Sequence, residues 1–312
     1  MSASVENDLA LVIQLLSRRV QPVSENAFQR LLHGRGGNIS ALCEWHIDQI
    51  GAVLLIVAYQ NVGWETAWLQ ALSQWAQGQG LRAVWIQRRY VALAPISVFW
   101  GEPTHLPSDM RVTEDGLNYE LRFANQNIGL FPDMLAGRRW VRDHCAGVRV
   151  LNLFAYTCGF SVAAVAGGAA KVVNIDMSKS SLAWGRRNHE LNGHDKTRVQ
   201  YFGHNVMKSF GRIERLAPFD LIIVDPPSFQ RGHFEAPKDY RRLLKRLPDW
   251  LIPAGRAMCC LNDPLLSQGR FFAEIIEPSG LSIVEILSAE AGSVAKGQTQ
   301  ALKTVITQKA RL

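Results

Sequence analysis

The sequence predicts an α/β fold in which a mostly parallel, doubly wound sheet follows a smaller N-terminal α+β domain. From Val148 onward, short apolar runs of strand length alternate with helical segments, as in a parallel sheet covered by helices. Three of these runs end in turn-forming or acidic residues: Val148–Gly159, Lys171–Asp176 and Phe219–Phe229. Ligands bind at the carboxyl ends of the strands in such sheets, so we expect these three ends to form one site.

The first part of the chain is expected to hold a helical segment, residues 1–37, and a small α+β domain, residues 38–105. Apolar residues recur at helical spacing over Val5–Val20, and a second short helix is expected over Ser24–Leu32. The small domain is expected to contain a strand, a helix and a strand: Gly51–Tyr59, Trp64–Gln77 and Leu81–Gln87. The tryptophans of its helix follow the helical period, which favours a core over a base-stacking surface.

Residues 106–147 are expected to form a β-hairpin and then a basic linker helix. The hairpin is expected over Arg111–Ala124, because Asp115–Gly116 is a typical two-residue hairpin turn. Residues 148–312 are expected to form the large domain, which would bind the ligand. Its expected strands are Val148–Phe154, Lys171–Asp176, Val199–Gly203, Leu221–Asp225, Arg256–Leu261, Leu281–Ala289 and Leu302–Gln308. We expect the last two to close the sheet as an antiparallel hairpin.

Composition indicates an ordinary globular protein with a basic surface. The chain has 34 Lys and Arg against 27 Asp and Glu, for a net charge of +7, which weakly favours a polyanionic partner such as RNA. The five cysteines are odd in number and fit neither a disulfide framework nor a zinc site, so reduced thiols in the cytoplasm and no metal are expected. We find no signal peptide and no apolar stretch of membrane-spanning length.

The residues at the three strand ends favour a nucleoside ligand without phosphates. A dinucleotide needs close backbone approach at several glycines, whereas the first turn has one, Gly159. Asp176 could accept hydrogen bonds from ribose hydroxyls; alternatively it is an acid at a helix N-terminus. Asp225 could accept a hydrogen bond from an amine, and Phe229 could stack on a base. The alternative for the Pro226–Pro227 pair is an ordinary strand terminator.

These motifs resemble the class I S-adenosylmethionine-dependent methyltransferases. The likeness rests on Asn152–Gly159, Asn174–Ser178 and Asp225–Phe229, and it extends upstream to Leu32–Gly36 and Gly129–Asp133. More narrowly, the chain is similar to the bacterial large-subunit ribosomal RNA methyltransferases that make 5-methylcytosine or 7-methylguanine. The resemblance implies a Rossmann-like class I sheet, S-adenosyl-L-methionine as cofactor and RNA as partner, which in that family is ribosomal. It also implies that the N-terminal RNA-binding domain of some relatives is missing.

The resemblance also implies roles for individual residues. The implied cofactor-binding residues are Phe131, Asp133, Arg138, Phe154, Ala155, Thr157, Gly159, Asp176, Met177, Asn205 and Asp225. The implied methyl-transfer site consists of Asp225, Pro226, Pro227 and Phe229. The chain departs from the family pattern at Cys158, where relatives usually have glycine, at Asn205, where an acid is commoner, and at Leu135, where arginine is frequent.

Two alternatives concern the reaction. Methylation of cytosine carbon 5 requires a cysteine nucleophile, but Cys259 and Cys260 lie inside a predicted strand, where buried, inert thiols are expected. Direct in-line transfer to a ring nitrogen or an exocyclic amine is therefore favoured.

A methyltransferase acting on a small molecule or a protein, and a cofactor-binding module with weak or no catalysis, stay open. The N-terminal helix could also pack on a second subunit, so a homodimer is considered.

Overall fold

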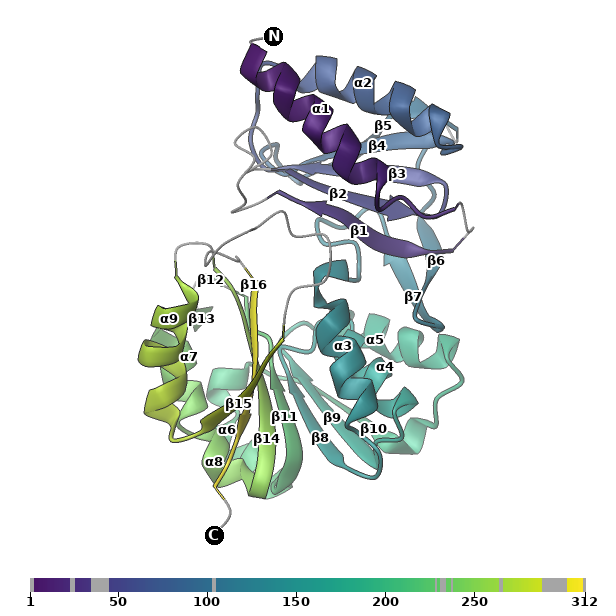
Figure 1. Ribbon diagram of the computed structural model, residues 1–312. Coiled ribbons are helices and arrows are strands. Elements are labelled where there is room, and N and C mark those ends of the chain that lie inside the picture. The colour runs from purple at the N-terminus through teal and green to yellow at the C-terminus, as the bar shows by residue number, and fades with distance from the viewer. Residues whose placement is uncertain are drawn as a thin grey trace. The chain divides into compact units, whose positions relative to one another are not determined.

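The computed structural model describes residues 3–22, 26–34, 45–102, 105–227, 229–230, 234–236, 238–263, 266–287 and 302–310. The contacts divide the chain after Asp133 into two compact units. We call these the N-terminal unit, which begins in purple in Figure 1, and the C-terminal unit, which runs from teal to yellow. No helix within the described residues combines the length and the apolar composition needed to cross a membrane.

The N-terminal unit is built on a five-stranded sheet of order β1-β2-β3-β4-β5. Its strands are β1 (Phe28–His33), β2 (Trp45–Ile50), β3 (Val53–Ala58), β4 (Ala83–Arg88) and β5 (Ile96–Gly101). Helices α1 (Ala3–Ser17) and α2 (Glu65–Gly78) pack on one face of this sheet, as Figure 1 shows. The predicted hairpin is present as β6 (Asp109–Glu114) and β7 (Leu117–Arg122), with Asp115 and Gly116 at positive φ in its turn. The tryptophan stripe of α2 belongs to the core, because Trp68 is fully buried and Trp64 and Trp75 pack against the same cluster.

The helix predicted over Ser24–Leu32 is wrong for the described residues, which form strand β1 from Phe28 onward. The pairing of β1 with β2 shifts register between Arg30 and Leu32, which marks a β-bulge. Leu31 and Leu32 are both fully buried as a result. Two consecutive buried residues break the alternation by which a strand is recognised from sequence, which explains the error.

The C-terminal unit contains a seven-stranded sheet of order β10-β9-β8-β11-β14-β16-β15. The strands are β8 (Arg149–Leu153), β9 (Lys171–Asp176), β10 (Val199–Gly203), β11 (Phe219–Val224), β14 (Leu251–Asn262), β15 (Ser282–Leu287) and β16 (Leu302–Gln308). Pairs among β10, β9, β8, β11 and β14 are parallel, whereas β16 runs antiparallel to both β14 and β15. The predicted mostly parallel sheet with an antiparallel final hairpin is confirmed.

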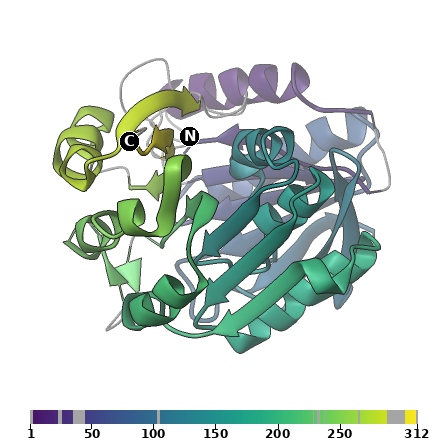
Figure 2. The ribbon, with the colours of Figure 1, turned by 90° about the horizontal axis from the view of Figure 1, so that it is seen from below.

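Helices flank both faces of this sheet, as the view in Figure 2 shows. The helices are α3 (Leu135–Asp143), α4 (Gly159–Ala166), α5 (Lys179–Leu191), α6 (Phe210–Leu216), α7 (Lys238–Leu244), α8 (Leu247–Trp250) and α9 (Gln268–Phe271). Helices α7 and α8 are separate, because Pro248 stands in the first turn of α8 and cannot continue a preceding helix. A short ladder, β12 (Phe229–Gln230) with β13 (Phe234–Glu235), comes after β11.

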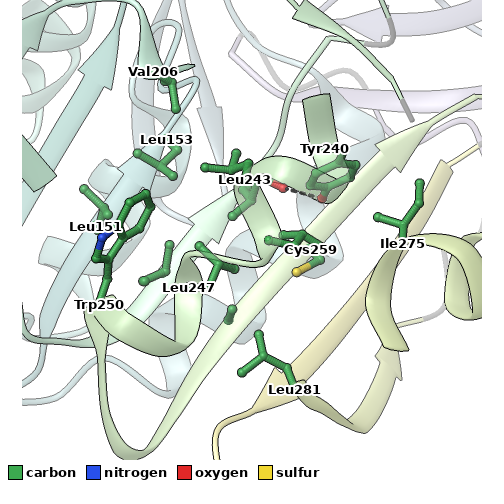
Figure 3. Close-up of a cluster of buried hydrophobic side chains, with 14 of the residues drawn as sticks. Leu151, Leu153, Val206, Tyr240, Leu243, Leu247, Trp250, Cys259, Ile275 and Leu281 are labelled. Carbon is green, nitrogen blue, oxygen red and sulfur yellow. Dashed lines mark hydrogen bonds between the residues drawn. The ribbon is translucent and has the colours of Figure 1, made fainter. Parts of the chain in front are cut away.

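One core cluster of the C-terminal unit lies between the sheet and helices α6 to α9 (Figure 3). Trp250 and Tyr240 are fully buried in it. The Tyr240 hydroxyl lies 3.2 Å from the carbonyl oxygen of Val224 and 2.8 Å from that of Cys260. Tyr240 therefore joins the ends of β11 and β14, which stiffens the sheet where the predicted site lies.

Candidate active site

The carboxyl ends of β8, β9 and β11 lie at one edge of the C-terminal sheet. Leu153 pairs with Ile175 in β9 and with Val224 in β11. Asp176 and Asp225 each come directly after one of these partners in sequence, so they lie at the same level of the sheet. Neighbouring strands lie about 4.8 Å apart, which places the two acids about 10 Å from each other along the edge. We call this edge, with the loop after β8, the strand-end site.

The loop between β8 and α4 has an unusual backbone. Phe154, Tyr156 and Cys158 have φ values of 56°, 46° and 62°, a region that favours glycine. The loop is fixed in part by the N–H of Ala155, which donates to the carbonyl oxygen of Ile175 at 3.1 Å. Strained conformations of this kind cluster at ligand sites and persist when their surroundings hold them in place.

Three residues of the same loop are buried. Ala155 is 6% exposed, Thr157 1% and Cys158 0%. Gly159, which begins α4, has no side chain. Phe154, Tyr156 and Gly159 are half-buried, so these positions keep part of the loop accessible to a ligand.

Asp176 is held at the end of β9 by two backbone groups. The Tyr156 N–H donates to Oδ2 at 2.9 Å, and the Ser178 N–H donates to Oδ1 at 2.8 Å. Burial raises the pKa of Asp176, and these two N–H groups partly offset that effect. Each carboxylate oxygen has two acceptor positions, so both can also accept from a diol. The adjacent Met177 side chain is 36% exposed and can contact a ligand beside the acid.

Helix α5 supports the loop by close packing. A Cβ atom placed on Gly185 would lie 2.4 Å from Sγ and 2.8 Å from Cβ of Cys158, so no larger residue fits there. Near the end of the same helix, the amide of Asn188 donates to the carbonyl oxygen of Thr157 at 2.9 Å. The position of α5 and the conformation of the loop are therefore coupled.

A buried polar chain lies beneath the strand-end site. Asn152 donates to Oδ1 of Asn174 at 2.9 Å, and Asn174 donates to Oγ of Ser161 at 3.0 Å. Ser161 Oγ lies 2.9 Å from Nε2 of His189, whose Nδ1 lies 2.9 Å from Nδ1 of His194. This series of hydrogen-bonded side chains links β8, β9, α4 and α5. Its His–His contact needs a lone pair on one ring nitrogen, so it cannot form when both rings are protonated.

This arrangement predicts acid sensitivity. Burial, followed by the nearby His194, lowers the pKa of His189 from 6.5 to about 3. Below the pKa that His189 has in the unfolded chain, the unfolded chain binds a proton that the native state excludes. The contribution of His189 to the free energy of unfolding is therefore complete above that pKa and decreases as the pH falls below it. Between about pH 7.5 and about pH 5 the free energy of unfolding should decrease by about 2 kcal/mol through this group.

Urea unfolding at the two pH values measures this effect. His189→Gln should show a pH dependence smaller by that amount, whereas His105→Gln, at an exposed position in the N-terminal unit, should behave as the wild type does. An unchanged pH dependence in His189→Gln would contradict the prediction.

The end of β11 carries the Asp-Pro-Pro motif. Asp225 is half-buried, Pro226 is buried and Pro227 is exposed. Phe229 pairs with Glu235 in the β12–β13 ladder, but Ser228 and the side chain of Phe229 lie outside the described part of the chain. The stacking role of Phe229 therefore stays a prediction.

The remaining predicted residues lie in different places. Asn205 caps a short 3₁₀ helix after β10, where its side chain accepts from the Lys208 N–H at 3.2 Å. Arg138 is buried in α3 of the C-terminal unit. Phe131, 40% exposed, and Asp133 belong to the N-terminal unit, where Asp133 forms an ion pair with Arg30 at 3.1 Å. Their predicted cofactor contacts stay predictions.

Cys259 and Cys260 are fully buried in β14 between β11 and β16. Burial raises the pKa of Cys259 to about 12 and that of Cys260 well above its usual value. Cys145 and Cys158 are also buried free thiols, whereas Cys43 lies outside the described residues. The predicted burial of the two β14 thiols is confirmed.

Several supporting residues were not predicted from sequence. Gly185, Ser161, His189 and Tyr240 act through contacts between segments distant in the chain. The one local signal was a polar residue in an otherwise apolar parallel strand, as at Asn152 and Asn174. Buried amides need partners, so such positions indicate that polar groups on the covering helices face them.

The fold and the strand-end site define a class I methyltransferase architecture. The S-adenosylmethionine-dependent methyltransferase family matches residues 29–305, and the chain belongs to that family. Its cofactor is S-adenosyl-L-methionine. A solved methyltransferase complexed with SAH has the same fold, with a TM-score of 0.82 at 22% identity over 99% of this chain and 82% of that one.

Two curated relatives are ribosomal RNA large subunit methyltransferases. The chain is 36% identical over 152 residues to ribosomal RNA large subunit methyltransferase K/L of a Psychrobacter strain, covering 46% of this chain and 19% of the relative. It is 31% identical over 188 residues to ribosomal RNA large subunit methyltransferase I of Aeromonas salmonicida, covering 57% of this chain and 47% of the relative. The matches thus span less than half of each relative's length.

Proposed function

We propose that this chain transfers a methyl group from S-adenosyl-L-methionine to a base of large-subunit ribosomal RNA. One observation carries the proposal: the loop between β8 and α4, the acid Asp176 and the Asp225–Pro226 motif all lie at one edge of the sheet. The names of the two curated relatives support ribosomal RNA as the substrate class.

The residues of the site fit the cofactor. The anchored carboxylate of Asp176 is suited to the ribose hydroxyls, and the exposed Met177 to the adenine face. Asn205, at the end of the neighbouring strand, would meet the adenine amine. The backbone of the Phe154–Gly159 loop would hold the methionine portion. When bound, the cofactor supplies an electrophilic methyl group on a sulfonium centre.

Positioning provides most of the rate effect in such a transfer, since donor and acceptor must be held in line. Asp225 and Pro226 stand at the end of a strand fixed by Tyr240, which limits their movement. The Asp225 carboxylate can accept a hydrogen bond from an amine on the target base and orient it toward the cofactor. Pro226 has no N–H to compete for that acceptor and leaves its carbonyl oxygen for the base.

A covalent route through cysteine is disfavoured. Nucleophilic attack needs a thiolate, whereas the raised pKa values of Cys259 and Cys260 keep both as thiols near neutral pH. Both side chains are also inaccessible to a base. We therefore propose direct transfer to a ring nitrogen or an exocyclic amine.

The Cys259→Ala, Cys260→Ala double variant should retain RNA methylation within about threefold of the wild type, because no catalytic group is removed. Transfer of a labelled methyl group to RNA measures this, with Cys145→Ala as a control for loss of a buried thiol. Abolished methylation in a folded double variant that still binds the cofactor would show that a thiol takes part.

The substrate class is tested by supplying labelled S-adenosyl-L-methionine with intact ribosomal RNA, with protein extract or with a small-molecule extract. The proposal predicts label in RNA that small molecules do not compete away. Label in protein or in small molecules would favour a methyltransferase that acts on a protein or a small molecule. Calorimetric binding of the cofactor without transfer to any acceptor would favour a binding module.

A further inference from the structure

Five exposed cations lie on α6, on α7 or in the turns next to these helices. They are Lys208, Arg212, Arg215, Arg242 and Lys245, which we call the α6–α7 basic surface. None of the five forms an ion pair with an acid within the described part of the chain. We infer that this surface binds the phosphate backbone of the RNA substrate, an inference that rests on the proposed function.

The cations form one surface because their helices are packed together. The Arg242 guanidinium carbon on α7 lies 5.5 Å from the centre of the Phe210 ring on α6. Phe210 in turn contacts Trp250 of α8 edge to face, at 5.3 Å between ring centres. Lys208, Arg212 and Arg215 stand four and three residues apart, so they share one side of α6 and the turn before it.

The acids on these helices are engaged elsewhere. Glu214 and Asp249 both pair with Arg246, which lies between α7 and α8. Asp239 accepts the backbone N–H of Glu235 at 2.9 Å. Glu214, Asp239 and Asp249 are the only acids on α6, α7 and α8, where basic residues outnumber them, so these helices keep the net positive charge that a site for a polyanion requires.

The surface extends to β10, the strand next to the strand-end site. The Arg212 guanidinium carbon lies 5.3 Å from the centre of the Phe202 ring in β10. The next residue, Gly203, pairs with Asp176. A strand of RNA with one base at the strand-end site can therefore continue across Arg212 toward α7. Two guanidinium groups are already held over aromatic rings, so binding a phosphate costs them less conformational freedom.

A protein partner fits this surface less well. Protein interfaces have a core of large apolar or aromatic side chains. None of the exposed large hydrophobic side chains in the described residues lies between β10 and the end of α8. The surface offers charge without an apolar centre, which is the character of a phosphate-binding face.

A charge-matched comparison tests the inference on the full chain. One variant combines Lys208→Gln, Arg212→Gln, Arg242→Gln and Lys245→Gln. The control combines Arg187→Gln, Lys196→Gln, Arg198→Gln and Arg270→Gln, four cations of the same unit that each lie near an acid. Binding of large-subunit ribosomal RNA is measured over a series of salt concentrations, and cofactor binding is measured by calorimetry.

The surface variant should bind RNA at least about tenfold more weakly at low salt, with a slope of log K against log salt smaller by about 3, since each phosphate contact on a single strand contributes about 0.7. In the control, the slope should decrease by about a third of that amount or less. Both should bind S-adenosyl-L-methionine as the wild type does. That result would support the inference.

Equal RNA binding by the surface variant and the control would overturn the inference, even if an acidic protein were then found on this surface. The outcome is separable from the proposed function. If the wild type neither binds nor methylates RNA, the proposed function fails; if it methylates RNA and the two variants are alike, the inference alone fails.

Discussion

Replacement of Asp176 by asparagine should lower the affinity for S-adenosyl-L-methionine by about 10- to 150-fold, because a hydrogen bond to a charged group is worth about 1.5–3 kcal/mol. The ionised carboxylate accepts the N–H groups of Tyr156 and Ser178 and retains acceptor positions for a ribose. An amide has a single acceptor oxygen, and its NH₂ group would face one of these N–H donors. Calorimetric titration with the cofactor measures the loss.

Asp195→Asn is the matched control for this substitution. Asp195 also accepts a backbone N–H, that of Thr197 at 2.9 Å, but it caps a 3₁₀ helix away from the strand-end site. It should leave cofactor affinity unchanged. Equal affinities for the two variants would mean that Asp176 is an ordinary helix-start acid, the alternative considered from the sequence.

Gly185→Ala should destabilise the protein by about 1–3 kcal/mol, the usual cost of overpacking, and weaken cofactor binding. The added methyl would lie 2.4 Å from Sγ and 2.8 Å from Cβ of Cys158, and 3.1 Å from the backbone carbon of Thr157. Helix α5 or the loop must move, and the loop carries the proposed cofactor contacts. Urea unfolding and calorimetry measure the two effects.

Cys158→Gly should rescue Gly185→Ala. It removes both of the closest atoms, and glycine suits the φ of 62° at this position. Gly211→Ala in α6 is the control, because the atom nearest to the added carbon, a side-chain nitrogen of Arg215, is 3.9 Å away and flexible. A Gly185→Ala protein as stable as the wild type, or a double variant no better than the single one, would contradict the coupling of α5 to the loop.

The strand-end site could be predicted because its signals are local. An apolar strand that ends in Asp225-Pro226-Pro227 marks the position where the strand stops and the start of a stiff loop after it. The same holds for the hairpin turn at Asp115–Gly116, where residue type alone selects the conformation. In a parallel sheet such ends share one edge, so their meeting is a consequence of the fold class.

Other features depend on contacts that no local pattern reports. The bulge in β1 buries Leu31 and Leu32 together, and the broken alternation prevents recognition of the strand from sequence. The close approach of Gly185 to Cys158 joins a helix to a loop far away in sequence. The ion pair of Asp133 with Arg30 ties the end of the N-terminal unit to its first strand, whereas the sequence suggested only a cofactor role for that acid.

Mass spectrometry of nucleosides from large-subunit ribosomal RNA, in cells with and without this gene, tests most directly whether the chain methylates a base of that RNA. The proposed function predicts that one methylated nucleoside is lost without the gene. The wild-type gene should restore it, and the Asp176→Asn variant should restore it poorly at limiting cofactor. An identical set of methylated nucleosides in the two strains would contradict the proposed function.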